Sequence, residues 1–170
     1  MKNFASSSFR LRDASLEIRL VYSLFLLFVM GGLLTTWLLQ FQRIGFGYER
    51  IVDYYLGGET SGQISFAKNF NVLLEETHFH TFMMAAIFLI LSHLFIATSV
   101  SRTAKWLFVL LTFFSNLFDI GGVWLIRYLS PLFAYLLMAS WMGLWTGYAA
   151  MILVPLYEMW LRPASPSNGS

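Results

Sequence analysis

The chain has 170 residues, of which 58% are hydrophobic and only 12% are charged, and its mean hydropathy is +0.65. Soluble domains carry about 25% charged residues, so much of this protein's surface is expected to face lipid. The sequence contains no cysteine, which excludes disulfide frameworks, thiolate metal centres and thiol redox chemistry. The net charge of +2 is too small to favour a nucleic-acid partner.

Four continuous apolar segments predict four membrane-spanning helices, at residues 20–41, 77–101, 106–126 and 131–157. Crossing a hydrocarbon core of about 30 Å takes roughly 20 helical residues, and the segments do not alternate as barrel strands do. The predicted fold is an all-α integral membrane four-helix bundle. We expect one domain over residues 1–162 and a disordered tail at residues 163–170. The first segment lacks a small-residue cleavage site and is expected to be retained.

Four spans place both termini on the same side of the membrane. Seven of the eleven basic residues fall on that side, namely Lys2, Arg10, Arg12, Arg19, Arg102, Lys105 and Arg162. By the positive-inside rule, both termini are predicted to be cytoplasmic. The sequence thus predicts a multi-pass protein of the bacterial inner (cytoplasmic) membrane.

The longest connection, between the first two spans, carries its own helical pattern. Apolar residues recur at helical spacing from Tyr48 to Leu56, and Gly57 follows them. This pattern predicts a short interfacial helix closed by a glycine cap. The same spacing from Phe66 onward predicts that the second spanning helix begins near Ser65, outside the hydrocarbon.

All three histidines, His78, His80 and His93, lie in the second span. Glu76 precedes His80 by four residues and Glu75 precedes His78 by three, so each carboxylate is predicted to pair with one imidazole. We therefore take His78 and His80 as candidate metal ligands. An ordinary interfacial role is an equal alternative for them, since polar side chains cost little at the water boundary.

Asp119 is the only charged residue within the four apolar segments, and placing a carboxylate there costs about 3 kcal/mol. It shares a helical stripe with Thr112, Ser115 and Asn116, which predicts that this face points into the bundle. By helical rise, Asp119 lies roughly 10 Å and His80 roughly 5 Å from the same membrane surface. Asp119, Asn116, Glu76 and His80 are thus predicted to line one cofactor site, with a purely structural role for Asp119 as the alternative.

The intervals from His80 to His93 and from His78 to His93 are 13 and 15 residues. This spacing resembles the histidine spacing along helices of membrane b-type cytochromes, a resemblance that covers one span of four. The resemblance implies a haem b ligated from the second span. Because no other span carries a histidine, the second ligand would come from Met138, Met142 or Met151, or from a second copy of the chain. A leucine four residues before His93 is also typical of some quinone pockets, and a buried structural histidine is the alternative.

Two faces of small residues are candidates for close helix packing. One carries Gly31 and Gly32, and the other carries Gly143 and Gly147. These faces are predicted to join helices within the bundle, to form a homodimer or to contact other membrane subunits.

No hydrolase, ATPase or nucleotide-binding motif is present in the sequence. The function that the sequence favours is a subunit of a membrane electron-transfer complex that binds haem b or a quinone. The alternatives are a non-catalytic accessory subunit of a larger membrane complex and a small transporter or proton-relay component that uses Asp119.

Overall fold

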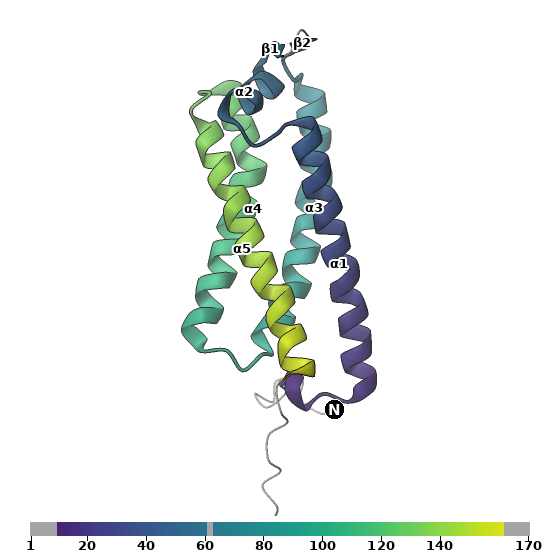
Figure 1. Cartoon of the computed structure of the whole chain (residues 1–170). Helices are drawn as coiled ribbons and strands as arrows, with labels where there is room; N and C mark the ends of the chain where they lie inside the picture. The colour runs from purple at the N-terminus through teal and green to yellow at the C-terminus, as the bar shows by residue number, and fades with distance from the viewer. Residues whose placement is uncertain (1–9, 61–62, 162–170) are drawn as a thin grey trace, which may run out of the picture.

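The computed structural model describes residues 10–60 and 63–161. The long helices form a bundle with smaller elements at its two ends (Figure 1). In chain order the elements are η1 (Leu11–Asp13), α1 (Leu16–Arg43), α2 (Tyr48–Leu56), β1 (Gly57–Thr60), β2 (Gln63–Phe66), α3 (Phe70–Ile96), α4 (Arg102–Tyr128) and α5 (Phe133–Trp160). The predicted disordered tail at residues 163–170 lies outside the described residues.

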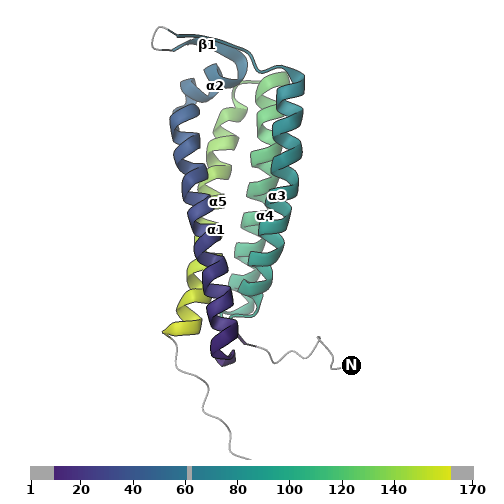
Figure 2. The ribbon, with the colours of Figure 1, turned by 90° about the vertical axis from the view of Figure 1, so that its right-hand side faces the viewer.

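The four long helices, α1, α3, α4 and α5, are each long and apolar enough to cross a membrane. This confirms the predicted four-helix membrane bundle. The start of α1 and the end of α5 lie at one end of the bundle, which we call the terminal end (Figure 2). Helix α2 and the strands β1 and β2 cover the opposite end, which we call the hairpin end.

The prediction of a short helix between the first two spans is confirmed by α2, which ends at Gly57 with a φ of +83°. The predicted start of the next helix near Ser65 is wrong. Residues 63–66 instead form β2, which pairs antiparallel with β1. Helix α3 starts at Phe70, where the side chain of Asn69 accepts a hydrogen bond from the Val72 amide at 2.9 Å. The stretch before Phe70 has too few apolar residues to separate a helical period from a strand alternation. The pattern therefore did not distinguish a helix from a strand there.

Helices α4 and α5 are the most closely packed pair. A Cβ atom on Gly143 would collide with the Ser115 hydroxyl, and one on Gly147 would collide with the Thr112 hydroxyl. Of the alternatives predicted for Gly143 and Gly147, the structure supports packing within the bundle rather than a partner or homodimer contact, because α4 of the same chain occupies this face. The glycines of α1 differ, since a Cβ on Gly31 or Gly32 would meet nothing within 4 Å in the described structure.

The terminal end is held by hydrogen bonds to backbone groups. The Arg19 guanidinium donates to three carbonyl oxygens, those of Arg12, Ala14 and Met159. The buried carboxylate of Glu158 accepts from the Ser99 amide at 2.7 Å and from the Ser99 hydroxyl at 2.9 Å. Glu158 thereby fixes the turn between α3 and α4 to the end of α5.

Candidate functional site

The polar stripe of α4 faces the interior of the bundle, as predicted. Thr112, Ser115 and Asn116 are buried, and Asp119 is half-buried. Asn116 and Tyr148 of α5 bond to each other twice. The Asn116 amide donates to the Tyr148 hydroxyl at 3.0 Å, and that hydroxyl donates back to the Asn116 carbonyl at 3.1 Å. Asn116, a predicted cofactor residue, is thus engaged in a contact between two helices.

Asp119 is bound by a residue that the sequence analysis did not single out. The indole N–H of Trp141, on α5, donates to Asp119 Oδ1 at 2.8 Å. Trp141 is only 5% exposed, so this hydrogen bond lies inside the hairpin-end half of the bundle. The second carboxylate oxygen has no hydrogen bond to any of the described residues, which leaves it open to a proton or a polar ligand.

His80 is the histidine that the structure brings close to this carboxylate. The His80 imidazole on α3 lies within electrostatic range of the Asp119 carboxylate on α4, with no hydrogen bond or ion pair between them in the described structure. Its Nδ1 lies 3.0 Å from the backbone carbonyl of Glu76. Because a carbonyl oxygen only accepts hydrogen bonds, Nδ1 carries the proton and Nε2 of the neutral ring keeps a free lone pair. Nε2 of the exposed His80 side chain is therefore the ring nitrogen that can accept a hydrogen bond.

The predicted pairing of the Glu76 carboxylate with His80 is wrong, because Lys68 takes that carboxylate. Lys68 Nζ lies 2.7 Å from Glu76 Oε1 and 4.4 Å from the centre of the Tyr54 ring. Burial alone would lower the pKa of Lys68, but the bonds to Glu76 and Tyr54 outweigh it and raise the pKa. The Lys68 carbonyl also accepts from Arg127 Nε at 2.8 Å. Lys68 therefore ties α2, α3 and α4 together at the hairpin end.

The other two histidines are not part of this arrangement. The exposed His78 ring packs edge-on against Phe79 and Phe82, with centroids 5.8 and 5.1 Å away. His93 is exposed near the terminal end, and its Nδ1 lies 2.8 Å from the Leu89 carbonyl. Across residues 10–60 and 63–161, no group of three or more His, Asp or Glu side chains is placed to hold a metal ion. The structure thus lends no support to His78 and His80 as joint metal ligands, or to a pair between Glu75 and His78.

Helix α2 covers this site from the hairpin end. Its buried residues Ile51 and Tyr55 belong to the same apolar cluster as Leu73 of α3 and Trp141 of α5. Burial raises the pKa of Tyr55, and the charges of Tyr54, Asp119 and Glu76 add to the shift. The Tyr55 phenol therefore stays neutral at ordinary pH and contributes a polar but uncharged group to this cluster.

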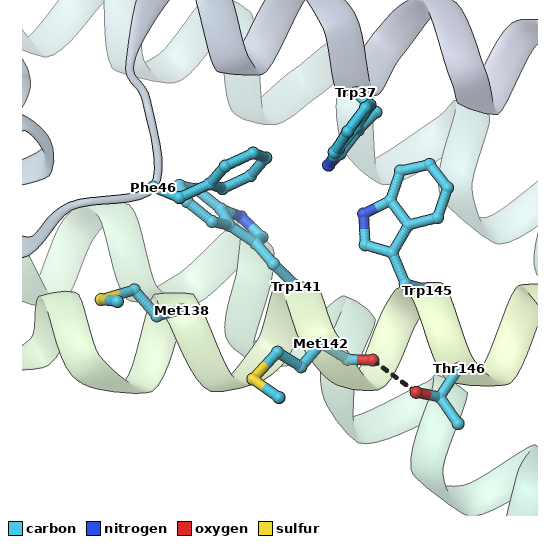
Figure 3. Close-up of a pocket in the computed structure, with 7 residues that line it drawn as sticks. All are labelled: Trp37, Phe46, Met138, Trp141, Met142, Trp145 and Thr146. Carbon is cyan, nitrogen blue, oxygen red and sulfur yellow. Dashed lines mark hydrogen bonds between the residues drawn. The ribbon is translucent and has the colours of Figure 1, made fainter.

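A pocket of about 460 Å³ lies between α1 and α5, and Trp141 forms part of its wall. Figure 3 shows its lining, which is aromatic and sulfur-rich: Trp37, Phe46, Met138, Trp141, Met142, Trp145 and Thr146. The Trp37 and Trp145 rings meet edge-on with centroids 5.7 Å apart, and Phe46 meets Trp141 edge-on at 5.8 Å. Met142, a predicted cofactor residue, forms part of the rim and is 74% exposed.

The sequence analysis missed this pocket. The four-residue interval between Trp141 and Trp145 places both indoles on one face of α5 and was the available signal. This interval could not reveal the third ring, Trp37, because that residue belongs to a helix more than a hundred residues earlier in the chain.

Comparison with known proteins identifies the architecture. Residues 45–166 match a family model described as a transmembrane helical domain. The chain belongs to this family of transmembrane helical domains. The family match begins just after α1 ends at Arg43, so it covers α2, the hairpin and the other three spans. No curated protein and no solved structure matches the chain.

Proposed function

We propose that this chain is a quinone-linked subunit of a membrane electron-transfer complex, in which Asp119 exchanges protons with the hairpin-end surface through His80. The observation that carries the proposal is the Asp119 carboxylate inside the spanning helix α4, which keeps one oxygen without a hydrogen bond to the described residues and has His80 of α3 within electrostatic range. A quinone takes up protons when it is reduced and releases them when its quinol is oxidised. A titratable carboxylate inside a membrane bundle, next to an imidazole that reaches the surface, supplies such a route.

The chemistry of each group fits this role. Nε2 of His80 is the open nitrogen of the ring, so a proton taken up there sits on the side not bonded to the Glu76 backbone. The Asp119 carboxylate keeps one oxygen without a hydrogen bond to the described residues while Trp141 orients the other.

The quinone version of the proposal has better support than the haem b version. A haem held by His80 needs a second axial ligand. The described part of the chain offers no histidine outside α3. Met138 and Met142 line the aromatic pocket, and Met151 is buried in the apolar cluster of Leu91 and Phe95. A lipid-soluble ring needs no metal ligand, only an apolar pocket and a few polar contacts.

The proposal is tested on the full chain, purified in a mild detergent and transferred to nanodiscs made with native lipids. Extraction should yield a quinone in equimolar amount, and the reduced-minus-oxidised visible spectrum should lack haem bands. The midpoint potential of the bound quinone should depend on pH differently in Asp119→Asn than in wild type, whereas the exposed control Glu49→Gln should behave as wild type. Haem bands, or a preparation without quinone, would overturn the proposal.

An accessory role in a larger membrane complex is the second candidate, and α1 favours it. Only Leu26 of this helix is buried, and the glycine pair Gly31 and Gly32 is open in the described structure. Small residues on a lipid-facing helix allow close approach of another helix. If a partner subunit packs here, Gly31→Leu should release the chain from its native complex without unfolding it.

A further inference from the structure

We infer that the aromatic pocket between α1 and α5 binds a neutral, lipid-soluble compound through a carbonyl oxygen. Two indole N–H groups, those of Trp37 and Trp145, carry the inference. Neither group donates a hydrogen bond to any residue within the described ranges 10–60 and 63–161. In Figure 3, both nitrogens lie on the ring edges that face the space beside Phe46 and Trp141.

An unpaired N–H group is costly in a membrane, because lipid tails offer no hydrogen-bond acceptor. Trp145 lies twelve residues into α5, about 18 Å along the helix axis, and so it is well below the membrane surface. The third indole of the pocket shows the alternative arrangement, since the Trp141 N–H is satisfied by Asp119. A ligand that supplies an acceptor oxygen would satisfy Trp37 and Trp145 in the same way.

The remaining lining defines the rest of the ligand. No charged side chain lines the pocket, and the only hydroxyl, that of Thr146, donates to the Met142 carbonyl at 2.8 Å. The ligand is therefore neutral. Aromatic rings and methionines favour a flat or unsaturated body, and a volume of about 460 Å³ accommodates one ring with the start of a chain. Met142 lines the pocket and is exposed on the outside of the bundle, so the pocket opens toward the lipid.

Two sources supply this chemistry, a quinone head group and the ester carbonyl of a membrane lipid. The quinone assignment rests on the function proposed above, whereas the carbonyl contact does not. Under that assignment Trp141, which lines the pocket and donates to Asp119, joins the ring site to the carboxylate.

The test is equilibrium binding of a radiolabelled short-chain benzoquinone to the full chain in nanodiscs. Trp37→Phe and Trp145→Phe each remove the N–H and retain a ring, and each should weaken binding by about 5- to 10-fold, the effect of one hydrogen bond. Trp106→Phe is the matched control, because Trp106 is exposed near the start of α4, away from the pocket. Decylbenzene, which has a ring and a chain but no carbonyl, should not compete. Thermal unfolding of each variant verifies that it is folded.

The outcomes separate the two claims. Quinone binding that is insensitive to both tryptophan substitutions, or that decylbenzene displaces, overturns the pocket inference and leaves the quinone-linked function standing. If a long-chain methyl ester binds with the same dependence on Trp37 and Trp145 while the quinone does not, the pocket inference holds and the quinone-linked function fails. Binding of neither compound overturns the inference.

Discussion

Trp141 Nε1 donates to Asp119 Oδ1 at 2.8 Å, and this hydrogen bond joins the polar interior of α4 to the wall of the aromatic pocket. Each group satisfies the hydrogen-bonding requirement of the other within the membrane. The carboxylate gains a donor, and the indole N–H gains an acceptor, in a place where neither water nor lipid provides one.

Replacing Asp119 separates its structural contribution from its acid–base contribution. Asp119→Asn keeps an acceptor oxygen for Trp141 and should unfold at nearly the wild-type denaturant concentration. Asp119→Leu leaves the buried indole N–H without a partner and should lower the free energy of unfolding by about 1–3 kcal/mol. Unfolding in detergent, followed by circular dichroism, measures both variants. Equal destabilisation by Asn and Leu would mean that the hydrogen bond contributes nothing.

The glycines of α5 are expected to be essential for its contact with α4. Gly147→Ala places a methyl group against the β-branched side chain of Thr112, and such overpacking costs about 1–3 kcal/mol. Gly121→Ala is the control, because a Cβ at that α4 position would meet nothing within 4 Å. We expect a lower thermal transition for Gly147→Ala only. A wild-type transition in both variants would show that the two helices can move apart freely.

The contact between Lys68 and Glu76 should make the hairpin end sensitive to alkali. The folded-state pKa of Lys68 is raised above that of the unfolded chain, so the stabilisation is fully present below about pH 10.4. It is lost as the pH rises through the folded-state pKa. Amide exchange in α2, compared between wild type and Lys68→Met at increasing pH, measures this loss after correction for intrinsic rates. Wild type should lose protection at high pH, whereas Lys68→Met should be less protected already at neutral pH and change little further.

Glu158 is expected to stabilise the terminal end, as Lys68 stabilises the hairpin end. It is 1% exposed, and its carboxylate accepts from both the amide and the hydroxyl of Ser99. Glu158→Ala removes these charged hydrogen bonds and should cost about 1.5–3 kcal/mol of unfolding free energy, whereas Glu158→Gln retains an acceptor and should cost less. Chemical denaturation of both variants in the same detergent provides the comparison. No difference between Ala and Gln would exclude a role for the acceptor.

The orientation in the membrane remains a prediction from the charge distribution. Alkaline phosphatase, which is active only outside the cytoplasm, should be active when fused after Gly58 and inactive when fused after Arg162. The opposite pattern would place the hairpin end in the cytoplasm and reverse the direction of proton exchange.

Much of the fold follows from the sequence, because hydrocarbon thickness and backbone hydrogen bonding leave few choices for long apolar segments. The four spans, the short helix α2 and the inward stripe around Asn116 were all predicted. The hairpin was not, since four-residue strands contain too few positions to establish a period. The sequence also left the neighbour of the Gly143 and Gly147 face undecided, because small residues look the same whether the approaching helix belongs to the same chain or to another.

The candidate site, like the fold, was predicted only in part from the sequence. Helical spacing placed Asp119 and His80 in one half of the bundle, but spacing along α3 suggested Glu76 as the partner of His80, and the structure gives that carboxylate to Lys68. Trp141 could not be assigned to Asp119 either, since the pairing depends on how α4 and α5 are rotated against each other. Contacts within one helix are readable from spacing, whereas contacts between helices depend on packing.

The central claim, that Asp119 reaches the hairpin-end surface through His80, is tested most directly by infrared spectroscopy in nanodiscs. At a pH low enough to protonate Asp119, a carboxyl stretching band should be present in wild type and absent in Asp119→Asn. On transfer to heavy water this band should shift promptly in wild type and in His93→Phe, and slowly in His80→Phe. A band that shifts equally fast in all three proteins, or that persists in Asp119→Asn, would contradict the claim.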